Sequence, residues 1–278
     1  MLPQTSDSST QSLFSRAGQC IACTDPTEKC RLTEVLLGDW EAGALVLADA
    51  TEPAPIGEPG RPARPRLVMP RQLPRRRPAS REGRAALLHA LAHIEFNAIN
   101  LALDAVYRFR GMPRQFYADW LKVAGEEACH FGLLRGRLRD LGYEYGDFDA
   151  HDGLWEMARK TAHDVMVRMA LVPRVLEARG LDVTPAMIDR LKKSGDDSTV
   201  AVLGIILRDE IGHVEIGTRW FRYACGQRGL DAQTTFRDLL VMHMKGRVKG
   251  PFHYEARGQA GFTADEMRDL ERLAGMIE

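Results

Sequence analysis

The sequence lacks an excess of either charge, because its 278 residues contain 38 Lys and Arg against 38 Asp and Glu. A chain with zero net charge has no global field that attracts nucleic acid or a membrane surface. It also lacks an uninterrupted apolar run of the roughly 20 residues that span a membrane. Its first residues lack the basic and then apolar pattern of a secretory signal. We therefore expect a cytoplasmic protein with no membrane partner.

Cysteine is also scarce, and the five cysteines form an odd set. In a chain without a leader this favours reduced thiols over disulfides. Cys20, Cys23 and Cys30 lie close together in the sequence, but no obvious fourth ligand accompanies them. Free thiols are therefore favoured over a metal knuckle.

No strand pattern is recognisable, whereas apolar residues recur at the spacings of three and four that indicate helices. Ser80 is placed to cap the first long helix, and Pro113 to open the second. Pro173 is expected to bend the third, and Gly180 to stop it. The predicted fold class is all-α. Long helices are expected over 80–109, 113–142, 154–179 and 197–225, and shorter ones within 1–50 and over 185–193, 231–245 and 264–277.

The chain divides into four predicted segments. These are an N-terminal helical segment (1–50), an extended strap rich in Pro and Arg (51–80), a four-helix bundle (81–228), and C-terminal helices packed on that bundle (229–278). Eight prolines in the strap preclude a regular helix there.

Arginines in and just after the strap could bind phosphates, which would suit a nucleic-acid partner. The strap contains no aromatic residue on which bases could stack, so attachment to acidic helix surfaces is favoured. Nucleic-acid binding stays an alternative. The arginines concerned are Arg61, Arg64, Arg66, Arg71, Arg75, Arg76, Arg77, Arg81 and Arg84.

Two Glu-x-x-His motifs carry the chemistry, Glu127 with His130 and Glu210 with His213. Residues three apart on a helix point to the same side, so each pair can hold one metal ion. Carboxylate and imidazole together suit iron, manganese or zinc. One such motif arises easily by chance, but two of them amid apolar residues are much more specific.

A further glutamate precedes each motif by nearly the same distance. Glu95 lies 32 residues before Glu127, and Glu177 lies 33 residues before Glu210. Two helical hairpins would each supply Glu and then Glu-x-x-His, which is the ligand set of ferritin-like di-iron and di-manganese bundles. Four carboxylates also neutralise two divalent cations. The predicted ligands of two iron ions, of which one or both could be manganese, are Glu95, Glu127, His130, Glu177, Glu210 and His213.

Neighbouring acids leave the register open. Glu126 could replace Glu127, and Asp209 or Glu215 could replace Glu210. Glu127 and Glu210 are preferred, because each has a histidine three positions later. The assignment of Glu177 as a ligand depends mostly on the symmetry between the two hairpins, because a proline interrupts the apolar stripe of its helix.

Several segments resemble a ferritin-like family known as domain of unknown function 455. They are HIEFNAI (93–99), GEEACHF (125–131), VLEARGLD (175–182), RDEIGHVEIG (208–217) and GPFHYEARGQAGFT (250–263). A more distant similarity is to the di-iron hydroxylase that oxidises a modified adenosine in tRNA. The resemblance implies a ferritin-like four-helix bundle and a di-iron site on the six residues above.

These observations predict a di-iron carboxylate oxidoreductase that uses dioxygen to oxidise or hydroxylate a substrate. The substrate would be a small molecule or a modified nucleoside, an electron donor protein would be a partner, and the protein would be a monomer or homodimer. One alternative is a ferroxidase or iron-handling protein. Another is a non-enzymatic helical scaffold whose acidic residues are solvated.

Overall fold

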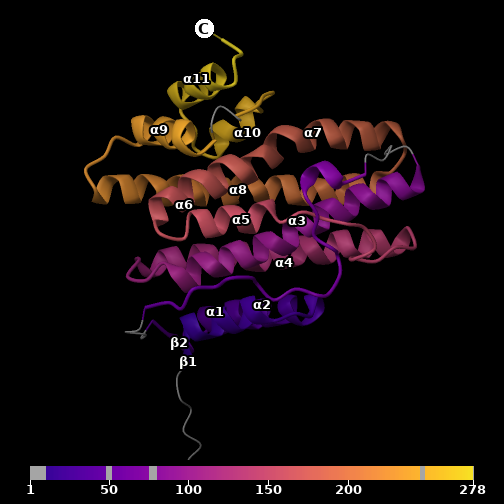
Figure 1. The fold of residues 1–278 in the computed structure, drawn as a ribbon, viewed down its shortest axis with the longest axis horizontal. Coiled ribbons are helices and arrows are strands. Elements are labelled where there is room, and N and C mark those ends of the chain that lie inside the picture. Colours follow the sequence, from indigo (N-terminus) through magenta and orange to yellow (C-terminus); the bar gives the residue numbers. More distant parts are fainter. Residues whose placement is uncertain (1–10, 48–51, 75–79, 245–247, 278) are drawn as a thin grey trace, which may run out of the picture. The chain divides into compact units, whose positions relative to one another are not determined.

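The structure is a computed structural model, and it describes residues 11–47, 52–74, 80–244 and 248–277. It confirms the all-α class (Figure 1). In these ranges the only strands are β1 (Gln11–Ser12) and β2 (Leu45–Val46), which pair in parallel. That the helices form a ferritin-like four-helix bundle stays a prediction.

Three helices are long: α3 (Arg81–Arg108), α4 (Arg114–Asp140) and α8 (Asp197–Gln227). The N-terminal helices are α1 (Leu13–Ala22) and α2 (Pro26–Glu41). Between α4 and α8 lie α5 (Gly153–Lys160), α6 (Val165–Leu171), the π-helical turn η2 (Val172–Glu177) and α7 (Ala178–Lys193). The chain then forms α9 (Ala232–Met244), α10 (Tyr254–Gln259) and α11 (Ala264–Leu273).

The chain forms two compact units. The first contains Met1–Ala63 and Ala98–Cys129, and the second contains Arg64–Asn97 and His130–Glu278. The division falls inside α3 and α4, so each of these continuous helices contributes one part to each unit. The four segments predicted from the sequence were divided by proline content and apolar periodicity, not by compactness, and their boundaries stay a prediction.

A buried lysine organises the first unit. Lys29, on α2, is fully buried, and its Nζ donates hydrogen bonds to the carbonyl oxygens of Cys20 (3.1 Å) and Ile21 (2.7 Å) and to Oδ1 of Asn100 (2.6 Å). These bonds join the end of α1 to α2 and to the later part of α3. All five cysteines are free thiols, as predicted.

In the second unit, α6, η2 and α7 pack against α8, and α9 and α10 also contact α8 (Figure 1). The close approach of η2 to α8 depends on a glycine. A Cβ atom on Gly217 would lie 2.2 Å from Cγ of Pro173, a distance that no ordinary contact allows. The glycine therefore lets the proline ring rest directly on the backbone of α8.

The start of α3 is as predicted, because the hydroxyl of Ser80 accepts a hydrogen bond from the backbone N–H of Gly83 (3.0 Å). The prediction for the third long helix was wrong. The chain leaves the helix at 161–164, between α5 and α6, and then runs without a break through α6, η2 and α7. Helix α6 begins at a cap where Asp164 accepts from the backbone N–H of Met166 (2.7 Å). Gly180 does not stop the helix, because α7 continues to Lys193 and buries Leu181 and Leu191.

The described part of the strap forms no α-helix, as its prolines predicted; it contains a 3₁₀ turn, η1 (Pro70–Gln72), and a parallel bridge between Leu67 and Ala150. Among its arginines, Arg66 forms an ion pair with Asp149 (2.6 Å), which lies between α4 and α5 and not on a helix. Arg75, Arg76 and Arg77 lie outside the described residues. Helix α10 was not predicted, and it begins where the ring of His253 accepts a hydrogen bond from the backbone N–H of Ala256.

Helix α3 is long and apolar enough to cross a membrane by length and composition alone. However, 72% of its most apolar stretch is buried inside the protein. This is typical of the core helix of a soluble protein.

Candidate metal centre

Five of the six predicted ligands lie on the three long helices. Glu95 lies on α3, Glu127 and His130 lie on α4, and Glu210 and His213 lie on α8. All five are buried, with exposed fractions between 0% and 9%. Ionisable side chains are rarely buried to this degree unless they are paired or bind a metal.

Four of them converge. Glu95, Glu127, His130 and Glu210 each offer one ligand atom, and these atoms lie within 4.8 Å of one another. Glu95, His130 and Glu210 belong to the second unit. Glu127 precedes His130 by three residues on the same helix, α4, so the two side chains share one helix face.

Three carboxylates gathered in a buried site repel one another unless a cation neutralises them. Carboxylate oxygens and an imidazole nitrogen are also the donors that iron, manganese and zinc accept. The residues therefore fit a metal ion, and the group of four can hold one.

His130 lies between two carboxylates. Its Nδ1 is 3.3 Å from Oε2 of Glu95, and its Nε2 is 3.1 Å from Oδ2 of Asp209. A carboxylate on Nε2 keeps the proton on that nitrogen and leaves Nδ1 to face a metal, as is usual for metal-binding histidines. Asp209 thus orients the ring, a role that the sequence did not reveal because Asp209 was considered only as a substitute for Glu210.

The electrostatic state of Asp209 suits this role. Partial burial raises the pKa of its carboxyl, but hydrogen bonds from Arg208 and His130 outweigh that effect and hold the pKa below its usual value. Nε of Arg208 lies 2.8 Å from Oδ1 of Asp209. The carboxyl is therefore ionised at neutral pH and accepts from the imidazole.

His213 lies beside the group of four. Its Nδ1 is 3.7 Å from Oε1 of Glu210, and its ring centroid is 5.8 Å from that of His130. The two Glu-x-x-His motifs thus bring their histidines together.

Glu177 is not part of the group of four. It is the last residue of η2 and is half-buried, and its carboxylate is not among the ligand atoms that gather within 4.8 Å. The bend expected at Pro173 is a full π-helical turn, which changes the direction of the residues that follow it. Its role as a ligand stays a prediction.

The surroundings of Glu126 and Glu215 differ from those of the preferred glutamates. Glu126 forms an ion pair with Lys122 (2.7 Å), and Glu215 forms one with Arg219 (3.4 Å). Both glutamates are partly exposed, and neither belongs to the buried group. Glu127 and Glu210 belong to the buried group.

The family model described as "Protein of unknown function (DUF455)" matches residues 22–268, which is most of the chain. The chain belongs to the DUF455 family. A protein from Haemophilus influenzae, described as an uncharacterized protein, is 49% identical over 253 residues, which cover 87% of this chain and 88% of the relative. No solved structure matches the chain.

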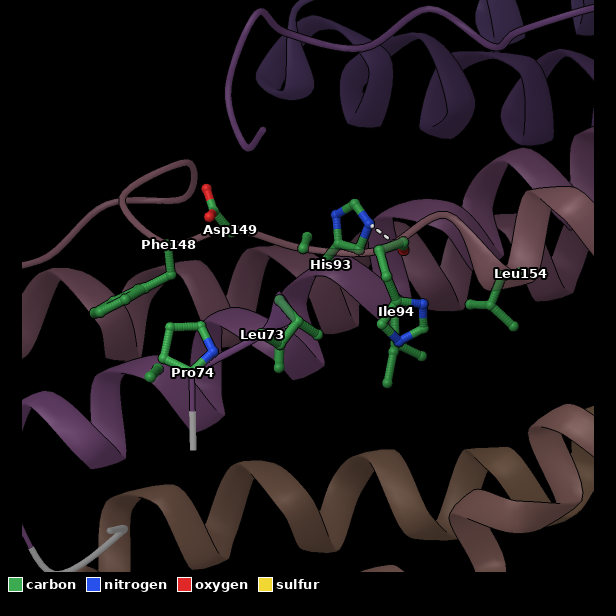
Figure 2. Close-up of a pocket in the computed structure, with 11 residues that line it drawn as sticks. Leu73, Pro74, His93, Ile94, Phe148, Asp149 and Leu154 are labelled. Atoms are coloured by element: carbon green, nitrogen blue, oxygen red, sulfur yellow. Dashed lines mark hydrogen bonds between the residues drawn. The ribbon is translucent and has the colours of Figure 1, made fainter. Parts of the chain in front are cut away.

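This DUF455 protein has an apolar cavity of about 190 Å³ on another side of α3 (Figure 2). His93 lines it, and the ring of His93 is held by the hydroxyl of Tyr145 (2.8 Å) and the carbonyl oxygen of His151 (3.1 Å). None of the six predicted ligands lines the cavity. Glu95 lies two residues after His93, which is about 200° around a helix, so the cavity and the metal ligands occupy different faces.

The other histidine of this helix turn is structural as well. The ring of His89 accepts a hydrogen bond from the backbone N–H of Gly146 (2.9 Å) and stacks on Tyr145 with ring centroids 5.3 Å apart. Together the two histidines fix the segment after α4 against α3. Neither belongs to the metal group.

Proposed function

We propose that this protein is a di-iron carboxylate oxidoreductase that activates dioxygen to oxidise or hydroxylate a substrate. The observation that carries the proposal is the buried convergence of Glu95, Glu127, His130 and Glu210 from three helices. Carboxylates with only a structural role are usually solvated at the surface, whereas these three are between 0% and 9% exposed.

We further propose that the centre holds two ions in a ferritin-like bundle. His213 supplies a second imidazole beside Glu210, and Glu177 supplies the fourth carboxylate. Four carboxylates then balance two divalent cations, and the ligand set is that of ferritin-like bundles. Iron is the preferred metal, with manganese as the substitute at one or both positions.

The residues have distinct proposed roles. Bound ferrous iron would supply the redox chemistry with dioxygen that amino-acid side chains do not provide. Glu95, Glu127, Glu177 and Glu210 are the carboxylates that would hold the ions, together with His130 and His213. Asp209 keeps the proton of His130 on Nε2 and so holds Nδ1 ready for the metal.

The proposal includes partners. The substrate is a small molecule or a modified nucleoside, and an electron donor protein returns the irons to the ferrous state. The protein acts in the cytoplasm as a monomer or homodimer.

Reconstitution with ferrous iron tests the function. The full chain is loaded without oxygen, desalted, and mixed with dioxygen in the presence of a chemical reductant. We expect two irons per chain to be retained and oxygen uptake to continue for many turnovers while reductant lasts. In a second mixing, with excess ferrous iron and dioxygen, accumulation of ferric iron far beyond two per chain would instead indicate an iron-handling protein. Failure to retain iron would indicate a scaffold and would contradict the proposal.

A further inference from the structure

The π-helical turn η2 determines where Glu177 points. Its hydrogen bonds join residues five apart, as the bond from the backbone N–H of Ala178 to the carbonyl oxygen of Pro173 shows. An extra residue in one turn rotates everything after it by about 100° relative to a regular α-helix. Such turns are rare, which indicates that contacts from outside the helix hold this one.

Arg174, inside η2, is anchored by the C-terminal part of the second unit. Its side chain is fully buried, and its Nη2 donates to Oε1 of Glu266 on α11 (2.5 Å). Its Cζ lies 4.9, 3.9 and 4.6 Å from the ring centroids of Phe221, Phe236 and Phe262. Movement of Arg174 out of this cage would leave a buried carboxylate without its partner, which is strongly destabilising. The ion pair therefore holds η2 in one place.

Glu266 also holds α8, the helix of Glu210 and His213. It is 2% exposed, and its Oε2 accepts from the backbone N–H of Thr263 (2.9 Å). The same oxygen lies 3.5 Å from Nη2 of Arg222, which belongs to α8. One buried carboxylate thus ties η2 to the helix that carries two of the predicted metal ligands.

The neighbouring residue of η2 is fixed as well. The ring of Pro173 rests on Gly217 of α8, so two successive residues of η2 each have their own partner. Conversion of η2 into an ordinary α-helical turn would rotate Glu177 and would separate Pro173 or Arg174 from its partner. The direction of Glu177 is thus coupled to these contacts.

We propose that Glu266 and Arg174 are positioning residues of the metal centre. Their ion pair keeps η2 in its π-helical form and thereby sets the direction from which Glu177 reaches a bound ion. This inference rests on the proposed function, in which Glu177 supplies the fourth carboxylate. It gives the C-terminal helices, which contain none of the six predicted ligands, a role in metal binding.

A double variant, Arg174→Met with Glu266→Gln, removes both charges together, so that neither is left buried alone. Methionine suits a site among aromatic rings, and the glutamine oxygen can still accept from the backbone N–H of Thr263. Arg222 is 42% exposed, so its charge stays solvated. Glu266→Asp is a milder second variant, because it keeps both charges and shortens only the reach to Arg174. Circular dichroism and urea unfolding establish that each variant is folded.

A matched control removes another buried ion pair. Arg108→Met with Asp104→Asn breaks the pair on α3, whose side chains are 12% and 0% exposed. Asp104 lies nine residues after Glu95, which is the opposite face of the helix. This control reports the effect of losing a buried pair without a change at η2.

The first measurement needs no metal. Amide hydrogen exchange is followed by mass spectrometry in peptides that cover 172–178 of the metal-free full chain. We expect exchange in the double variant to be at least tenfold faster than in the wild type, a smaller increase in Glu266→Asp, and no change in the control. Equal exchange in the wild type and the double variant would overturn the proposal.

The second measurement is the affinity for ferrous iron without oxygen, by competition with a chelator. The weaker-bound ion should lose about 10- to 100-fold in affinity in the double variant, as is usual when a group that orients a ligand is removed. Glu177→Gln alone should cause a loss of similar size, and its addition to the double variant should cause little more, because both act through the same carboxylate.

The outcomes separate this inference from the proposed function. Two ions bound equally well by the wild type and the double variant, the same loss in the control, or a loss that adds to that of Glu177→Gln would overturn the positioning role alone. A wild-type protein that retains no iron would contradict the proposed function and the positioning role together.

Discussion

Nε2 of His130 lies 3.1 Å from Oδ2 of Asp209, and this contact joins α4 to α8 at the metal ligands. If the carboxylate orients the imidazole, Asp209→Ala should weaken iron binding about 10- to 100-fold while the protein stays folded. Competition with a chelator of known affinity measures the change. Glu215→Ala, on the same helix but partly exposed, is the control and should bind iron normally. Equal affinities for all three proteins would remove Asp209 from the site.

The contact of Gly217 with Pro173 makes a prediction about stability. A methyl group at position 217 would lie 2.2 Å from Cγ of Pro173, so η2 would have to move away from α8. We expect Gly217→Ala to lower the free energy of unfolding by about 1–3 kcal/mol, the usual effect of overpacking. Gly204→Ala on the same helix meets nothing within 4 Å and should stabilise by about 0.5–1 kcal/mol. Urea unfolding distinguishes the two, and equal effects of both substitutions would refute the argument.

Lys29 should be essential for the stability of the first unit. Lys29→Met would leave two carbonyl oxygens and Oδ1 of Asn100 buried without this donor. We expect the free energy of unfolding to fall by about 3 kcal/mol. Lys122→Met is the control, because that side chain is 58% exposed and its partner Glu126 stays in contact with water. A loss no larger than that of the control would show that the hydrogen bonds of Lys29 contribute little.

Glu144 should contribute to the acid sensitivity of the protein. Partial burial raises the pKa of its carboxyl, but hydrogen bonds from Arg135, the backbone of Tyr145 and Arg139 outweigh this and lower the pKa from 4.5 to about 2. A depressed pKa stabilises the folded state above pH 4.5, and this stabilisation is lost as the pH falls towards 2.

The variant Glu144→Gln isolates this effect. The side chain is 41% exposed, so solvent screening limits the contribution to at most about 1 kcal/mol. Unfolding in urea from pH 6 to pH 3 should show a difference between wild type and variant that shrinks as the pH falls. A difference that does not change with pH would contradict the assignment.

Some of this structure follows from the sequence because it is local. The spacing of three between Glu127 and His130, and between Glu210 and His213, fixes each pair on one helix face before any packing is known. Glu95 could be predicted as a further ligand because it lies on an uninterrupted stripe of apolar residues along one helix face. Ser80 likewise marks the start of α3 through the chemistry of its own side chain.

Other features depend on which helix faces meet, and a single sequence does not contain that information. Asp209 acts on His130, a residue 79 positions away. Pro173 indicates a bend, but its close packing on Gly217 of α8 is not evident from the sequence. Similarly, Arg174 and Glu266 lie on separate helical segments, and only the fold brings them together.

The central claim is a metal centre of Glu95, Glu127, His130 and Glu210, and anomalous scattering at the iron edge tests it most directly. Crystals of protein expressed with iron and grown without chelator are needed for wild type, Glu127→Gln and Glu126→Gln. Glu126 is the matched control, because it precedes Glu127 on the same helix and pairs with Lys122 instead.

We expect two anomalous peaks among the predicted ligands in the wild type and in Glu126→Gln. In Glu127→Gln the peaks should be lost or strongly reduced. Wild-type crystals without an iron peak at these residues, or peaks that persist unchanged in Glu127→Gln, would contradict the account.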